Sequence, residues 1–155
     1  MKINPMNEAM KEASRGISEA SGGPFGSVVT KGGKIIGRGH NRVVEQNDPT
    51  SHGEVEAIRD ACNSIGNFDL SGCELYTTCY PCPMCLGAIM WARIDKVYYC
   101  LTSDDVKEIG FDDKAFYEVF ESETEKEKLL ILDLKERESC LEILKDYVQS
   151  NPTIY

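Results

Sequence analysis

The sequence predicts an α/β protein, a three-layer α/β/α sandwich with a central mixed sheet of five strands. Segments with the two-residue period of strands alternate along the chain with segments that have the 3.6-residue period of helices. The first two strands follow each other as a hairpin, so part of the sheet is expected to be antiparallel. Amphipathic helices separate the later strands, which is typical of a sheet covered on both faces.

The composition predicts one domain over residues 1–155. The chain has 155 residues, of which 41% are hydrophobic and 28% charged, values typical of a globular protein with its own core. We expect neither a membrane span nor a signal peptide, because residues 1–21 are polar and amphipathic. The seven cysteines lack the spacing of a disulfide framework. These features predict a cytoplasmic protein with reduced thiols.

The first expected elements are a helix over residues 4–21 and the hairpin. Asn4 can cap the helix, Pro5 suits its first position, and two glycines end it. The hairpin strands are predicted over residues 25–30 and 35–40, joined by a turn rich in glycine and lysine. The residues that follow, up to position 49, are expected to form a loop.

The middle of the chain alternates helix and strand. We expect a helix over residues 52–62 and a strand over 73–78. Pro81 interrupts the strand pattern, and a helix is predicted from there to residue 92. A strand rich in valine and tyrosine follows over residues 96–101.

The C-terminal third has weaker patterns. Residues 103–120 are expected to form short helical pieces, and residues 121–128 are a charge run typical of a solvated face. Residues 129–134 are the candidate for a fifth strand. A final helix is predicted over residues 136–148.

Two short motifs about thirty residues apart carry candidate metal ligands, H-G-E at 52–54 and P-C-P-M-C at 81–85. His52, Cys82 and Cys85 offer one imidazole and two thiolates, which are three ligands for a zinc ion that prefers four. The fourth position is then open for water, as in catalytic rather than structural zinc sites. Glu54 lies two residues after the histidine, where it can transfer the protons of that water.

Cys79 offers a competing interpretation, since it forms a second C-x-x-C with Cys82. A site made of His52, Cys79, Cys82 and Cys85 would be structural and catalytically inert. We expect Cys79 to belong to the end of the strand, before the break at Pro81. The remaining cysteines fall within apolar patterns and are expected in the core: Cys62, Cys73, Cys100 and Cys140.

The pattern H-x-E…P-C-x-x-C is shared by zinc-dependent nucleobase deaminases. The chain resembles the cytidine deaminase-like superfamily, and within it the bacterial guanine deaminases. The similar segments are G-G-P-F-G at 22–26, N-D-P-T at 47–50, residues 79–89, W-A-R at 91–93 and G-F-D-D at 110–113. Gly53 and Tyr80 are departures, since alanine and glutamate are usual at these positions.

The resemblance implies a hydrolase that acts on a cyclic amidine C–N bond, converting guanine to xanthine and ammonia in purine metabolism. One zinc ion per chain would be held by His52, Cys82 and Cys85. Glu54 and Asp113 would be the catalytic residues.

The resemblance also implies how a purine base is bound. Asn41 would contact its polar edge, Phe25 and Trp91 its ring faces, and Gly53 would lie at the floor of the pocket. Guanine deaminases exchange C-terminal segments between two subunits, so a homodimer is expected, with residues 121–155 swapped. Tyr155 would then close the active site of the partner chain.

Two other functions remain open from the sequence. A tRNA adenosine deaminase, or another nucleoside or heterocycle deaminase, would share the zinc site. The formal net charge of −9, from 17 Lys and Arg against 26 Asp and Glu, favours a small-molecule substrate over nucleic acid. Neither nucleic acid nor a membrane is an expected partner. The second alternative is a non-catalytic structural zinc module.

Overall fold

The computed structural model describes residues 3–122, 135–150 and 153. The chain divides into two compact units, Met1–Tyr117 and Glu118–Tyr155. The first unit contains the sheet and the helices that pack on it, and helix α6 (Lys114–Glu121) runs through the division. The second unit contains helix α8 (Arg137–Gln149), which confirms the expected final helix.

The sheet of the first unit has four strands in the order β2-β1-β3-β4. They are β1 (Gly26–Lys31), β2 (Lys34–His40), β3 (Cys73–Cys79) and β4 (Lys96–Leu101). β1 is antiparallel to both of its neighbours, whereas β3 and β4 are parallel. The predicted mixed sheet is therefore confirmed, with four strands instead of five. The candidate fifth strand, residues 129–134, lies outside the described residues.

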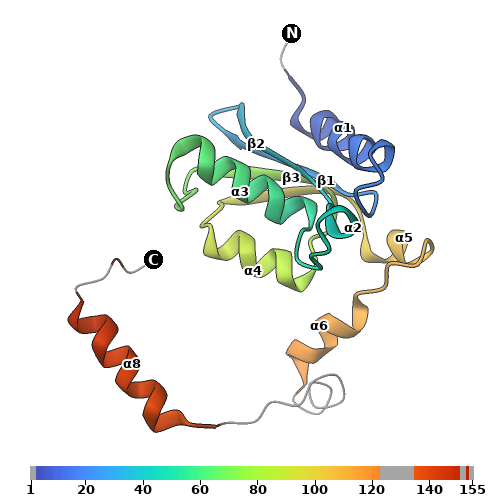
Figure 1. The fold of residues 1–155 in the computed structure, drawn as a ribbon. Coiled ribbons are helices and arrows are strands. Elements are labelled where there is room, and N and C mark those ends of the chain that lie inside the picture. The colour runs from blue at the N-terminus through green and yellow to red at the C-terminus, as the bar shows by residue number, and fades with distance from the viewer. Residues whose placement is uncertain (1–2, 123–134, 151–152, 154–155) are drawn as a thin grey trace. The chain divides into compact units, whose positions relative to one another are not determined.

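Helices cover both faces of this sheet, as Figure 1 shows. α1 (Pro5–Ser18) packs on one face, and its N-cap is Asn4, whose side chain accepts a hydrogen bond from the Met6 N–H at 3.0 Å. α3 (Gly53–Ile65) and α4 (Pro83–Trp91) pack on the opposite face. This arrangement gives the three layers that the sequence predicts.

Short helices lie in the predicted loop after β2 and in the region after β4, where short helical pieces were predicted. α2 (Val43–Gln46) lies within the predicted loop, has no side-chain cap, and ends at Asn47 in the left-handed conformation. α5 (Ser103–Lys107) begins at Thr102, which forms a capping box with Asp105. Together with α6, α5 accounts for the predicted short helical pieces of the C-terminal third.

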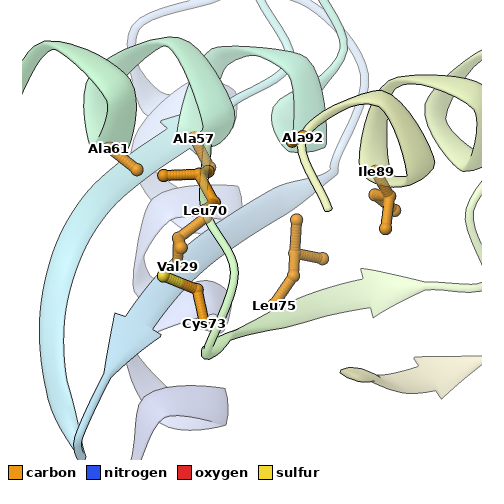
Figure 2. Packing of buried hydrophobic residues seen from close by; sticks show 8 residues of the cluster. All are labelled: Val29, Ala57, Ala61, Leu70, Cys73, Leu75, Ile89 and Ala92. Atoms are coloured by element: carbon orange, nitrogen blue, oxygen red, sulfur yellow. The ribbon is translucent and has the colours of Figure 1, made fainter. Parts of the chain in front are cut away.

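The main core lies between the sheet and the α3–α4 layer (Figure 2). Its eight buried side chains come from two strands, two helices and the segments that join them: Val29, Ala57, Ala61, Leu70, Cys73, Leu75, Ile89 and Ala92. Small alanines on α3 face larger aliphatic residues on β1 and β3. The helix therefore lies close to the sheet, and its N-terminus is held in a fixed position.

Two glycines of β2 permit this close approach. A Cβ atom at Gly37 would lie 2.4 Å from the carbonyl oxygen of Ala57, and one at Gly39 would lie 2.4 Å from the Ala57 nitrogen. Real Cβ contacts are longer than 3.0 Å, so any side chain at either position would push α3 away from the sheet. None of the helices in the described ranges is long and apolar enough to cross a membrane.

Candidate active site

The candidate metal ligands lie at the beginning of two neighbouring helices. His52 is the N-cap residue of α3 and Cys82 the N-cap residue of α4, and both have extended backbone conformations. Neither side chain forms a capping hydrogen bond with its own helix. Both are therefore available to bind a ligand. Pro83 at the first position of α4 fixes the backbone there, and Cys85 follows on the first turn.

The three ligand atoms are arranged as a zinc site requires. The Nδ1 atom of His52 lies 3.6 Å from the Sγ atom of Cys82 and 3.6 Å from that of Cys85. A tetrahedral zinc ion with Zn–S of about 2.3 Å and Zn–N of about 2.0 Å has an S···N edge of roughly 3.6 Å. Among the described residues, these three form the one group of candidate ligands within 4.8 Å of one another.

The two cysteine sulfurs of the site differ in their pKa. The hydrogen bond that Cys82 accepts from the Cys85 thiol, together with the nearby His52 ring, lowers the pKa of Cys82 to about 4. The same hydrogen bond, together with burial, raises the pKa of Cys85. A metal ion replaces protons at such a site, because it binds the thiolate and not the thiol.

Cys79 lies apart from this group. Its buried thiol is directed at the carbonyl oxygen of Thr102, with an S···O distance of 3.8 Å. Burial raises its pKa to about 11, which disfavours the thiolate that a metal would need. The position of Cys79 therefore supports a three-ligand site and disfavours the structural four-ligand alternative.

Glu54 lies on the first turn of α3 with its carboxylate beside the metal ligands. The residue is only 5% exposed. Its Oε1 atom accepts a hydrogen bond from the Thr77 hydroxyl at 3.0 Å, and its Oε2 atom lies 3.4 Å from the Cys85 sulfur. Burial raises the pKa of Glu54, as expected for a carboxyl group that must take up and release protons near neutral pH.

A cavity of about 680 Å³ opens in front of these residues. His52, Cys82 and Glu54 line one part of it, so the candidate metal site is accessible from the cavity. Of the residues predicted to contact substrate, Phe25 and Asn41 line its wall. A cleft of this size, mostly apolar and with a few polar groups, is typical of a small-molecule site.

Two polar side chains of the cavity wall have atoms that the protein leaves available. Asn41 is buried, and its Oδ1 atom accepts hydrogen bonds from the backbone N–H groups of Gly23 and Val43 at 3.1 and 3.2 Å. Its amide nitrogen is therefore the group that can face a ligand. The buried Oδ1 atom of Asp113 has no hydrogen-bond partner among the residues that the structure describes, and burial raises the pKa of this carboxyl group.

The aromatic wall of the cavity contains residues that the sequence analysis missed. Phe25 contacts Phe111 edge to face, with ring centroids 5.0 Å apart and an interplanar angle of 86°. Phe111 and Phe116 both line the cavity, as does Tyr80. Phe111 lies within the G-F-D-D segment, next to the acidic pair, and its position there is the signal that could have identified it.

The structure does not bring all predicted site residues together. Trp91 is 68% exposed and lines a separate, smaller hollow with Gly87, Met90 and Arg93, not the main cavity. Gly53 is buried against the backbone of β1, where a Cβ atom would lie 3.2 Å from the Phe25 carbonyl oxygen. Tyr155 lies outside the described residues.

The three-ligand assignment predicts how single substitutions change the zinc content. Replacing His52, Cys82 or Cys85 with alanine should reduce bound zinc well below one ion per chain and abolish catalysis, because two ligands hold the metal weakly. The matched control is Cys79→Ala, which should keep one zinc ion per chain. Elemental analysis of the purified variants measures this, and zinc loss in Cys79→Ala would contradict the assignment.

The chain is similar to known deaminases. It matches the family described as the cytidine and deoxycytidylate deaminase zinc-binding region over residues 2–101. It is 48% identical to the guanine deaminase of Bacillus subtilis over 120 residues, 77% of each chain. It is 44% identical to the tRNA-specific adenosine deaminase of Aquifex aeolicus over 91 residues, 59% of this chain and 60% of the relative.

A solved structure resembles nearly the whole chain. The X-ray structure of guanine deaminase from Bacillus subtilis has a TM-score of 0.86 and 40% sequence identity, and the likeness covers 99% of both chains. Both half-motifs of the zinc site fall within the residues that the family match covers. The chain therefore belongs to the cytidine and deoxycytidylate deaminase family of zinc-binding enzymes.

Proposed function

We propose that the chain is a guanine deaminase, a hydrolase that converts guanine and water to xanthine and ammonia. The observation that carries this proposal is the arrangement of the cavity. A three-ligand zinc site and the buried carboxylate of Glu54 lie on one side, with Asn41 and Asp113 also on the wall. The 48% identity to the guanine deaminase of Bacillus subtilis supports the same substrate.

The cavity fits a flat purine base. Phe25 and Phe111 offer apolar ring surfaces that suit an aromatic heterocycle. The amide nitrogen of Asn41 is a donor for an acceptor on the polar edge of the purine, because the Asn41 oxygen is already bound to two backbone N–H groups. The Oδ1 atom of Asp113, which bonds to no other group in the described part of the chain, is an acceptor for the amino group.

Two carboxyl groups, those of Glu54 and Asp113, carry out the proton transfers of the reaction. When bound by His52, Cys82 and Cys85, zinc would act as a Lewis acid that activates water near neutral pH. Glu54 accepts a proton from the attacking water and delivers it to the ring nitrogen beside the amino-bearing carbon. The amino group needs a proton before it leaves as ammonia, and Asp113 is positioned on the cavity wall to assist there.

A tRNA adenosine deaminase function is the main alternative, since relatives of that name share the zinc-binding segment. The net charge of −9 disfavours it, because binding to a phosphate backbone depends on clustered lysine and arginine. The tRNA-specific adenosine deaminases are also less similar in sequence. Those of Aquifex aeolicus and Buchnera aphidicola are 44% and 37% identical to the chain, against 48% for the guanine deaminase of Bacillus subtilis.

We also propose that the enzyme is a cytoplasmic homodimer in which residues 121–155 pass to the partner chain and Tyr155 covers its active site. The separation of residues 118–155 as a compact unit of its own supports a segment that can be exchanged. The seven cysteines are free, which is in keeping with a reducing compartment.

The role of Glu54 is tested by Glu54→Gln. This variant should keep one zinc ion per chain and lose activity by at least about 10²–10⁴-fold, because the amide cannot carry the proton. The matched control is Glu56→Gln on the same turn of α3, where Glu56 pairs with Arg59 at 2.6 Å instead of facing the cavity. Steady-state ammonia release measures both variants, and an active Glu54→Gln would remove Glu54 from the mechanism.

The substrate is tested by ammonia release from guanine, adenine, guanosine, cytosine, cytidine and an anticodon stem-loop. Guanine should be the preferred substrate. Asp113→Asn should lose guanine turnover while retaining zinc, whereas Asp104→Asn, a change on the exposed face of α5, should behave like the wild type. Turnover of the stem-loop with guanine untouched would assign the chain to the alternative function.

The swapped segment is tested by deleting residues 151–155. The truncated protein should keep its fold and zinc but lose most of its guanine turnover, because water would enter a site that the tail no longer closes. Circular dichroism, elemental analysis and ammonia release measure these properties. A fully active truncation, or a wild-type monomer in analytical ultracentrifugation, would show that the tail has no part in the reaction.

A further inference from the structure

A chain of buried hydroxyl groups leads from the sheet to the carboxylate of Glu54. The Oγ1 atom of Thr77 lies 3.0 Å from Oε1 of Glu54, and the Oγ atom of Ser27 lies 3.0 Å from Oγ1 of Thr77. Ser27 and Thr77 are both fully buried, with 0% exposure. The metal ligands do not need either hydroxyl, so the proposed mechanism gives these two hydroxyl groups no role.

The backbone holds both hydroxyl groups in place. Ser27 of β1 and Thr77 of β3 are direct partners in the antiparallel register of the two strands. They face α3, because a Cβ atom at Gly53 would lie 3.4 Å from the Ser27 hydroxyl. Groups carried by central strands are positioned more rigidly than groups carried by loops.

The hydrogen bonds between Ser27, Thr77 and Glu54 can have only one donor-to-acceptor direction. An ionised carboxylate has only acceptor atoms, so Thr77 must donate its single hydroxyl proton to Oε1 of Glu54. The Thr77 oxygen can then act only as an acceptor toward Ser27, which must donate. Oε1 is therefore occupied by a fixed donor. Oε2 accepts a hydrogen bond from the Cys85 thiol at 3.4 Å, but Cys85 has no proton to donate when it binds a metal as a thiolate. Oε2 is then the oxygen left for the reaction.

We propose that Thr77, supported by Ser27, is a positioning residue that makes Oε2 of Glu54 the oxygen that carries the proton. The proposal rests on the proposed function of Glu54 as the proton carrier. Glu54 takes up the proton at Oε2 and releases it from the same oxygen, so the carboxylate returns to its initial state. Oε1 remains an acceptor in both states, and the hydrogen bond from Thr77 persists throughout the reaction.

The test compares two substitutions at position 77. Thr77→Val keeps the shape of the side chain but removes the hydroxyl group, and it should lower kcat by about 10–100-fold, the effect typical of losing a group that orients a reacting residue. KM should stay within about threefold and zinc at one ion per chain, since the substrate and metal contacts are unchanged. Thr77→Ser restores the hydroxyl and should recover most of the activity.

Thr30→Val is the matched control. Thr30 lies on β1, is 1% exposed, and bonds the carbonyl oxygen of Glu74 at 3.5 Å, away from Glu54. Each valine variant loses one buried threonine hydroxyl, so the two should have similar thermal stability. However, kcat should fall only in Thr77→Val. A wild-type kcat in Thr77→Val, or a loss of kcat that follows a loss of zinc, would overturn the proposal.

A double substitution separates positioning from a general effect on the site. Adding Thr77→Val to Glu54→Gln should cause no further loss of kcat, because Thr77 acts through Glu54. A full additional loss would show that Thr77 acts independently of Glu54 and would overturn the proposal.

A crystal structure of zinc-bound Thr77→Val gives a readout that does not depend on the substrate. The Glu54 carboxylate should rotate from its wild-type orientation, while His52, Cys82 and Cys85 stay in place. Wild-type protein that does not deaminate guanine would refute the proposed function alone. An unchanged Glu54 carboxylate in the Thr77→Val crystal would refute the role of Thr77 alone.

Discussion

The site depends on two helices that begin at neighbouring points on one face of the sheet. α3 starts directly after His52, and α4 starts directly after Cys82. Two cysteine sulfurs and the Glu54 carboxylate lie close together there, and like charges removed from water repel one another. The positive ends of the two helix dipoles offset part of this repulsion before a metal is bound. A metal ion of charge +2 offsets the rest, which explains why this corner of the fold suits a cation.

Local sequence patterns predicted much of this arrangement. The hairpin, the helices at both half-motifs and the mixed sheet follow from periodicity, from turn residues and from the break at Pro81. The ligand set was predictable because the types and spacing of His52, Cys82 and Cys85 match the needs of one metal ion. α2 was missed because it is only four residues long and lacks a side-chain cap, so its sequence resembles a loop.

The rest of the site is built from contacts between residues far apart in the chain. Phe111 and Phe116 reach the cavity because the segment after β4 returns to the start of α3, and no local pattern contains that information. Thr77 has the sequence context of an ordinary strand residue, and only the packing of α3 on the sheet places its hydroxyl beside Glu54. Trp91 shows the reverse error. Its position close to the cysteine motif predicted a place in the substrate site, but its side chain lines a separate hollow on the surface.

The glycines of β2 have a consequence for how the protein tolerates sequence change. Gly37 and Gly39 do not line the cavity, yet a methyl group at either one would overlap the backbone of α3. The displacement would be passed along a rigid helix to His52 and Glu54 at its first turn. In a saturation mutagenesis experiment, both positions would resemble catalytic residues, because the accuracy of the chemistry depends on the absence of two side chains.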